Sequence, residues 1–207
     1  MSSLCAHCQS TSEALSHKLL TTDNFYVVCD THPLTEGHLL VIPKNHTACM
    51  GALTDDLFQE FLALYQKFSK FINDTYGVVS SFEHGIIGQT VFHAHTHILP
   101  YSGAIKSIVP EGIAYLRKLK NIKKIKDVYN KEGKYLFVSL GDNKWVVDLS
   151  LGRLRFFRDR FAVALGVPER GDWRELGRNE TGMRAAAQDI KRLQAKWDKY
   201  KKRQSMY

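Results

Sequence analysis

Long apolar runs, cysteines and prolines are all scarce in this sequence. No window approaches the ~20 apolar residues that a transmembrane helix needs, and the 207 residues include 4 cysteines and 5 prolines. The first residues, MSSLC, have neither the basic start nor the apolar segment of a secretion signal. We therefore expect no membrane partner, a cytoplasmic location and, in that reducing compartment, no pair of disulfides.

Positive charge is scarce in the first half only. Residues 1–104 hold 4 Lys and Arg against 9 Asp and Glu, a balance of −5, whereas residues 105–207 hold 25 against 12, a balance of +13. The sequence therefore divides near residue 104. A basic half is either an ordinary solvated surface or a face that attracts polyanions such as RNA, DNA or a polyphosphate.

The first half shows the pattern of strands around one long helix. Apolar residues recur at helical spacing over 54–74, with Asp55 and Asp56 in the first turn, where the helix dipole favours negative charge. Alternating or continuous apolar runs predict strands at 24–30, 38–43, 77–85 and 89–100. We expect an α+β fold in which an antiparallel sheet packs against one long helix.

The second half predicts a basic α/β extension made of a hairpin and helices. The apolar pattern of residues 134–149 is typical of a β-hairpin. Helices are expected at 109–120, 154–166 and 183–200. We accordingly expect a domain at 1–104, which carries the candidate site, and a C-terminal extension at 105–207.

Three histidines occupy every second position of FHAHTHILP, residues 92–100. In a strand, His93, His95 and His97 would share one face about 6–7 Å apart, close enough to surround a single phosphate. A neutral imidazole attacks phosphorus directly and forms a phosphoramidate, so this chemistry requires no catalytic metal. A three-histidine zinc site is the competing interpretation, although zinc ligands are more often gathered from separate elements.

A pair of cysteines near the start of the chain has the spacing of a metal-binding motif. Cys5-Ala-His-Cys8 is a C-x-x-C, and a tetrahedral zinc site needs two or more further ligands. The alternative is a frayed N-terminus with two free thiols. We expect His7 to be exposed and to bind nothing, and Cys29 and Cys49 to serve packing.

The segment GQTVFHAHTHILP resembles the signature of the histidine triad (HIT) superfamily, and VCDTHPLTEGHLLVIPKNH at 28–46 is similar to a second stretch of that family. The resemblance implies that His95 is the nucleophile that becomes nucleotidylated on an α-phosphate. It further implies that His97 contacts the phosphate, that His38 supports the triad, and that Gln89 and Thr90 reach the phosphate or the leaving group.

The resemblance also assigns the nucleoside and the metal. Asp30 falls where the family places an acid that holds the ribose hydroxyls, although an Asx-turn at a strand end explains an aspartate there as well. Tyr26 and Val28 are expected near the base, which we expect to be a purine. The resemblance extends the cysteine pair into a structural zinc set of Cys5, Cys8, His46 and His93.

One position departs from the family pattern. Many phosphoramidase-type members carry asparagine where this chain has Phe82, and this puts the leaving-group chemistry in doubt. The neighbouring Glu83 could be an ion-pair partner, a general acid or a charge at the end of a strand. We favour the charge at the strand end.

The C-terminal half has a weaker resemblance of its own. FRDRFAVALGVPERGDWRE, residues 157–175, is similar to the CwfJ-type branch, whose members are associated with RNA lariat handling. The sequence therefore predicts a nucleotide hydrolase or transferase acting through His95, and leaves open an RNA-associated binding or end-processing protein, which would allow a nuclear location. Three roles are open to the basic half. It could bind the RNA backbone, cover the nucleotide pocket, or support or replace a subunit contact of the homodimer typical of the family.

Overall fold

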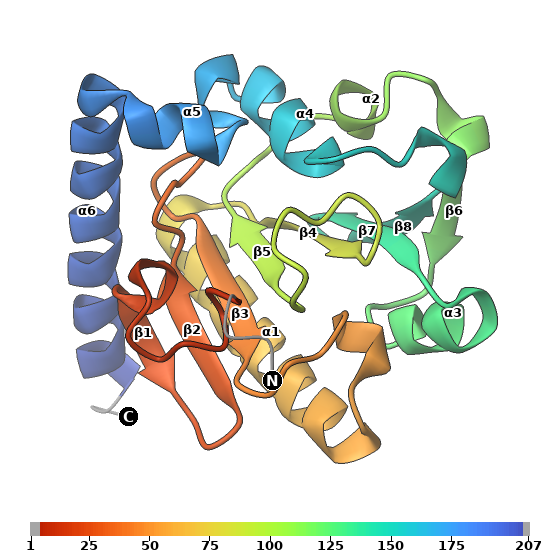
Figure 1. Cartoon of the computed structure of the whole chain (residues 1–207), viewed down its shortest axis with the longest axis horizontal. Helices are drawn as coiled ribbons and strands as arrows, with labels where there is room; N and C mark the ends of the chain where they lie inside the picture. Colours follow the sequence, from red (N-terminus) through yellow and green to blue (C-terminus); the bar gives the residue numbers. More distant parts are fainter. Residues whose placement is uncertain (1–4, 205–207) are drawn as a thin grey trace.

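The computed structural model describes residues 5–204, in which one eight-stranded sheet runs through both halves of the chain (Figure 1). Its strand order is β1-β2-β3-β5-β4-β7-β8-β6, and all neighbours are antiparallel. The strands are β1 Lys18–Thr21, β2 Phe25–Cys29, β3 Leu39–Pro43, β4 Ser80–Gly85, β5 Thr96–Leu99, β6 Leu116–Leu119, β7 Tyr135–Leu140 and β8 Asn143–Val147.

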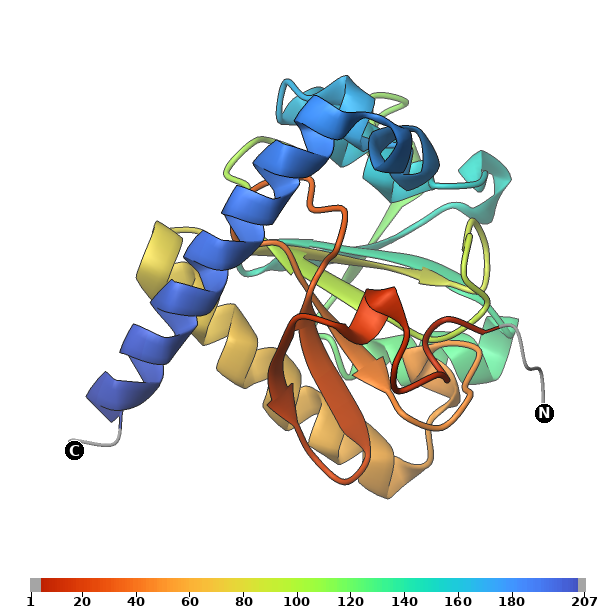
Figure 2. The ribbon, with the colours of Figure 1, turned by 60° about the vertical axis from the view of Figure 1, so that its left-hand side comes forward.

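Helices cover both faces of this sheet, so the predicted α+β class is confirmed. The α-helices are α1 Asp55–Tyr76, α2 Ile105–Ile108, α3 Lys124–Glu132, α4 Phe156–Ala164, α5 Trp173–Arg178 and α6 Glu180–Gln204. Short 3-10 helices lie at η1 Glu13–Leu15, η2 Met50–Ala52, η3 Ile113–Tyr115, η4 Leu149–Leu151 and η5 Pro168–Arg170. Figure 2 shows α1 and α3 on one side of the sheet, with α4 and α5 on the other.

The long helix forms where the apolar spacing predicted it. Its buried residues Phe58, Phe61, Phe68 and Ile72 lie on one face against the sheet. The helix ends at Gly77, whose φ of 76° is a left-handed conformation that glycine adopts without steric cost. Trp197 of α6 packs against Phe68 and Phe71 of this helix, so the C-terminal helix is docked on the first half.

The second half continues the sheet of the first. Residues 80–85 of β4 pair in register with residues 135–140 of β7, so the hairpin β7–β8 lies on the edge that β4 would otherwise expose. The predicted hairpin and the predicted helices at 154–166 and 183–200 are all present. The continuous sheet therefore joins the basic extension to the acidic first half through backbone hydrogen bonds.

Two predictions of local structure are wrong. Residues 109–120 form no α-helix, because Gly112 has a φ of 110° and residues 116–119 pair with β8 as strand β6. Only the three residues of the 3-10 helix η3 are helical there. An apolar run of this length is ambiguous between helix and strand, and the free edge of the hairpin decides it. The strand expected over 89–100 is restricted to 96–99, and residues 89–95 form a loop.

The interpretation of Glu83 as a strand-end charge is also wrong. Its side chain is fully buried and accepts hydrogen bonds from the backbone N–H of Met50 (2.8 Å) and the hydroxyl of Tyr135 (2.8 Å). Burial raises the pKa of Glu83 to about 7. This carboxyl therefore fastens the segment before the long helix to the sheet.

Replacing Glu83 by glutamine should remove a pH dependence of stability. Because the folded-state pKa of about 7 lies above the ordinary 4.5, the folded protein retains a proton that the unfolded chain has lost, and stability falls as pH rises between these values. We expect wild type to lose up to about 3 kcal/mol of unfolding free energy across this window. Urea unfolding at several pH values measures it, with exposed Glu175→Gln as the control; an equally steep loss in Glu83→Gln would contradict the assignment.

Candidate active site

A cavity of about 220 Å³ opens beside the second and third histidines of the triad. Leu40 of β3 and Arg158 of α4 both line it, so it lies on the sheet face that carries α4. Its walls come from the N-terminal segment, the loop after β2, the loop before β5, and the extension. The lining residues are Ala6, His7, Ser12, Glu13, Ala14, Asp30, Thr31, His32, Leu40, Thr90, Val91, His95, His97, Arg158 and Trp173.

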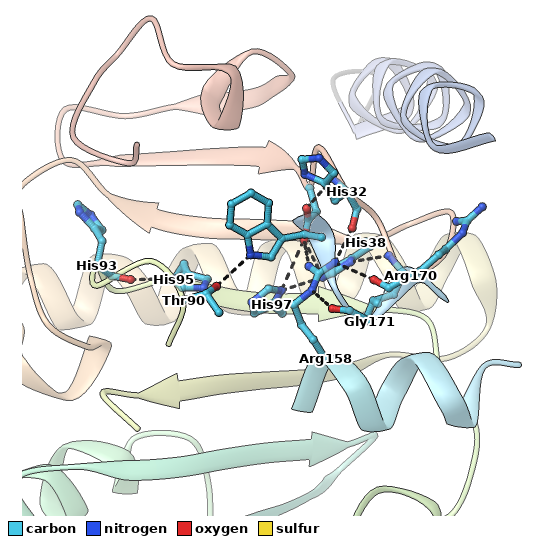
Figure 3. A network of polar contacts seen from close by, with 12 residues as sticks. His32, His38, Thr90, His93, His95, His97, Arg158, Arg170 and Gly171 are labelled. Atoms are coloured by element: carbon cyan, nitrogen blue, oxygen red, sulfur yellow. Dashed lines mark hydrogen bonds and ion pairs between the residues drawn. The ribbon is translucent and has the colours of Figure 1, made fainter. Parts of the chain in front are cut away.

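His95 presents an unprotonated nitrogen at this cavity. Its Nδ1 lies 2.6 Å from the carbonyl oxygen of His93 (Figure 3), and because a carbonyl oxygen only accepts, Nδ1 carries the proton. Burial lowers the pKa of His95, so the ring is neutral at neutral pH. The lone pair of the neutral ring is therefore on Nε2, where it can act as a nucleophile.

His97 presents the opposite function, an N–H donor. The backbone N–H of Leu34 donates to Nδ1 of His38 (3.0 Å), so Nε2 of His38 carries a proton and donates to Nδ1 of His97 at 2.9 Å. This leaves the proton of His97 on Nε2, which is buried and has no hydrogen-bond partner among residues 5–204. Burial lowers the pKa of His38 to about 4 and that of His97 well below 6.5, so both rings are neutral.

The extension supplies a buried cation beneath the histidines. Nη1 of Arg158, on α4, lies 2.7 Å from Oδ2 of Asp30, and Nη2 donates to the carbonyl oxygen of His32 (Figure 3). Burial alone would raise the pKa of Asp30, but Arg158, His38 and the N–H of His32 hold it below its usual value. Asp30 is thus an ion-pair partner as well as the residue that closes an Asx-type turn on His32.

The extension also forms one wall of the cavity. The indole N–H of Trp173 donates to the hydroxyl of Thr90 (3.1 Å), and its ring contacts the ring of His32 at 5.7 Å between centroids. Neither Arg158 nor Trp173 was assigned to the site from the sequence, although both lie in the motif at 157–175. Only the pairing of β4 with β7 brings that motif over the triad.

The first histidine of the triad does not share a face with the other two. His93 lies in the loop before β5, and its Nε2–H donates to the carbonyl oxygen of Pro43 (2.7 Å), which leaves the lone pair on Nδ1. This Nδ1 lies 3.4 Å from Sγ of both Cys5 and Cys8. The expectation that all three imidazoles surround one phosphate is therefore wrong for His93.

The four predicted zinc ligands are brought together. Sγ of Cys5, Sγ of Cys8 and one ring nitrogen each of His46 and His93 all lie within 4.8 Å of one another. Two thiolates and two imidazoles are the donor set of a closed tetrahedral zinc site, and the lone pair of His93 faces the thiols. The residues present fit a structural zinc ion.

A second group, Asp30, His38 and His97, is compact but unsuited to a cation. His38 and His97 direct their facing nitrogens into a hydrogen bond with each other, and the guanidinium of Arg158 already lies on the carboxylate. Within residues 5–204, the three triad histidines do not themselves form such a compact group, so a zinc site made of the triad is not favoured.

The remaining predicted residues lie around the cavity without all lining it. Thr90 lines it, whereas the side chain of Gln89 turns away and donates to the carbonyl oxygen of Ala48. Tyr26 and Val28 pack with Leu40, which lines the cavity, but neither lines it.

The prediction that His7 is exposed is wrong. Its side chain is 4% exposed, lines the cavity, and stands edge-on to the ring of His95 with 5.0 Å between centroids. Desolvation by burial lowers the pKa of His7 to about 2, so the ring is neutral.

Sequence comparison identifies the family. The HIT domain matches residues 11–103. An uncharacterised HIT-like protein of Borreliella burgdorferi is 36% identical over 104 residues, which cover 46% of this chain and 74% of that protein. Adenosine 5'-monophosphoramidase of Saccharomyces cerevisiae is 34% identical over 90 residues, and the match covers 43% of this chain but only 56% of the yeast protein. The chain belongs to the HIT family.

Solved structures show weaker overall similarity. A histidine triad nucleotide-binding protein of Sulfolobus tokodaii is 27% identical with a TM-score of 0.42, covering 48% of this chain and 71% of that one. A Zn-bound histidine triad family protein of Mycobacterium smegmatis is 24% identical with a TM-score of 0.36, covering 50% and 78%. The similarity of residues 157–175 to the CwfJ-type branch stays a prediction. Within residues 5–204, no helix has the length and apolar character to span a bilayer.

Replacing Arg158 by methionine should destabilise the fold strongly, because it leaves the carboxylate of Asp30 buried without its partner. We expect a loss of about 3–5 kcal/mol of unfolding free energy. Adding Asp30→Asn should restore at least half of the loss, since no unpaired charge then remains. Urea unfolding of the single and double variants measures both, with exposed Arg178→Ala as the control; a single variant as stable as wild type would show that the pair does not hold the halves together.

Proposed function

We propose that this protein is a nucleotide hydrolase or transferase that cleaves at the α-phosphate of a nucleoside 5′-phosphate derivative through a covalent nucleotidyl-His95 intermediate. The observation that carries the proposal is the complementary pair of imidazoles at the cavity. His95 offers a lone pair on Nε2, His97 offers an N–H that has no partner among the described residues, and their ring centroids lie 5.0 Å apart. A phosphorus centre needs such a nucleophile on one side and a donor to its oxygens on another.

The first step breaks the bond between phosphorus and the leaving group. The lone pair of Nε2 of His95 attacks the α-phosphorus, a P–N bond forms, and the bonding pair departs with the leaving group, which takes a proton from water. The imidazolium that results donates through Nδ1 to the carbonyl oxygen of His93, which stabilises its positive charge. His97 Nε2–H donates to a non-bridging oxygen of the phosphoryl group.

The second step releases the mononucleotide. Water attacks the phosphorus, the P–N bond breaks with its electrons returning to Nε2, and the water loses a proton to solvent. An alcohol or phosphate in place of water gives transfer instead of hydrolysis.

The substrate is proposed from the cavity and from the relatives. Asp30 lines the cavity beside the histidines, in keeping with the ribose-binding role that the family resemblance implies, although one of its oxygens is already shared with Arg158. Relatives from three fungi are named adenosine 5'-monophosphoramidases. We therefore propose an adenosine 5′-phosphate derivative, such as a phosphoramidate, a dinucleoside polyphosphate or an adenylylated species.

We further propose that Cys5, Cys8, His46 and His93 hold one structural zinc ion. Bound zinc would fix the N-terminal segment against the loop that carries His95, because His93 of that loop is one of the four ligands. It would also help to orient His95, because the carbonyl oxygen of His93 accepts the Nδ1–H of His95. RNA binding by the basic half and a homodimer stay predictions.

Replacing His95 by alanine should abolish turnover and covalent labelling together. Incubation with a labelled diadenosine polyphosphate should leave acid-labile, base-stable label on wild-type protein, and peptide mapping should place it on His95. We expect the variant to carry no label and to be at least about 10³-fold slower. Unchanged turnover in His95→Ala, with a native unfolding curve, would remove the nucleophile assignment.

Removing the metal should loosen the N-terminal segment. Elemental analysis is expected to find one zinc per chain in wild type and less than that in Cys8→Ser, while a Cys29→Ser control retains it. Chelation should increase amide exchange in residues 5–17 and lower thermal stability, because a closed site contributes directly to folding. Two zinc ions per chain, or none, would contradict the proposed set.

A further inference from the structure

We infer that His7 is a fourth histidine of the reaction centre, which donates a hydrogen bond to a non-bridging oxygen of the α-phosphoryl group as His95 attacks. The inference rests on the proposed function and adds a residue to it. His7 stands within the cysteine pair, in a position that zinc binding does not use. The family resemblance gives it no role.

The ring of His95 has two edge-on imidazole neighbours at the same distance. His7 and His97 each have their centroid 5.0 Å from that of His95, with interplanar angles of 77° and 65°. His7 also contacts His93, whereas His97 contacts His38 and Phe82. The two neighbours therefore approach His95 from different parts of the structure, one from the N-terminal segment and one from the sheet.

The tautomer of His7 follows from its burial. Its Nδ1 is buried and has no hydrogen-bond partner within the part of the chain that the structure describes. An unmade hydrogen bond is rarer for a buried N–H than for a buried acceptor, so Nδ1 carries the lone pair and Nε2 carries the proton. The ring lines the cavity, so Nε2–H is the polar group that it can offer to a bound molecule.

The chemistry needs a second donor of this kind. As the α-phosphorus becomes five-coordinate, charge is spread over its equatorial oxygens, and one N–H from His97 serves only one of them. Preorganised donors in a dry cavity stabilise such charge without reorganising. His7 is held by the segment between Cys5 and Cys8, so its donor is fixed by the backbone that brings the two thiols to His93.

Replacing His7 by phenylalanine or by glutamine distinguishes the hydrogen-bond donor of the side chain from its packing against His95. His7→Phe retains an aromatic ring against His95 and has no N–H, whereas His7→Gln retains an N–H at a similar reach. We expect kcat with diadenosine triphosphate to fall about 10²-fold in His7→Phe and to recover at least about tenfold in His7→Gln. His17→Phe, which makes the same replacement away from the cavity, is the matched control.

Ligand affinities distinguish a transition-state contact from a ground-state contact. Adenosine with orthovanadate mimics the five-coordinate phosphorus, and we expect its affinity to fall in His7→Phe by about the same factor as kcat, whereas AMP affinity changes by less than about threefold. Zinc content and urea unfolding should equal those of wild type, which shows that packing and the metal set are intact.

Three results would overturn the inference. They are an unchanged kcat in His7→Phe, an equal loss of AMP and vanadate affinity, and a loss of turnover that follows the loss of zinc. Failure of the proposed function has a different signature: the wild-type protein would carry no label on His95. If wild type becomes labelled on His95 and His7→Phe becomes labelled at the same rate, only the role of His7 is refuted.

Discussion

The buried ion pair between Asp30 and Arg158 joins the acidic and basic halves of the chain at the floor of the cavity. Both side chains are 6% exposed, so each charge depends on the other for compensation. Asp30 lies 3.6 Å and 3.8 Å from the facing nitrogens of His38 and His97, and the guanidinium balances its charge there. With both rings neutral, the hydrogen-bond chain from Leu34 to His97 has one direction only.

The extension therefore serves the site as well as the fold. Strand β7 covers the edge of β4, and α6 covers part of the long helix through Trp197. Within this chain the extension thus covers a sheet edge and part of the long helix of the first half. Arg158 and Trp173 then reach the cavity from the same extension. The basic half thus completes the cavity while contributing few of its charges to it.

The N-terminal segment acts from the other side. The candidate zinc ligands fix His93, and the backbone of His93 orients His95, so the first histidine of the triad serves architecture while the second faces the cavity. The family resemblance predicted the four residues that come together as candidate zinc ligands, but the alternating pattern of the histidines misled, because residues 89–95 leave the strand. In a loop, the direction of each side chain depends on its tertiary contacts. Successive residues do not alternate regularly as they do in a strand, so the sequence does not predict which way they point.

Local patterns of the sequence determined the long helix, the strands at 25–29, 39–43 and 80–85, and the hairpin, since each depends on neighbours within a few residues. Tertiary structure alone decided the pairing of β4 with β7, the strand at 116–119, the burial of Glu83 and His7, and the arrival of Arg158 at Asp30 from 128 residues away. Each of these depends on which surface a segment meets after the chain has folded. Charge and burial at such contacts have no signature along the chain, because the partner lies in another part of the sequence.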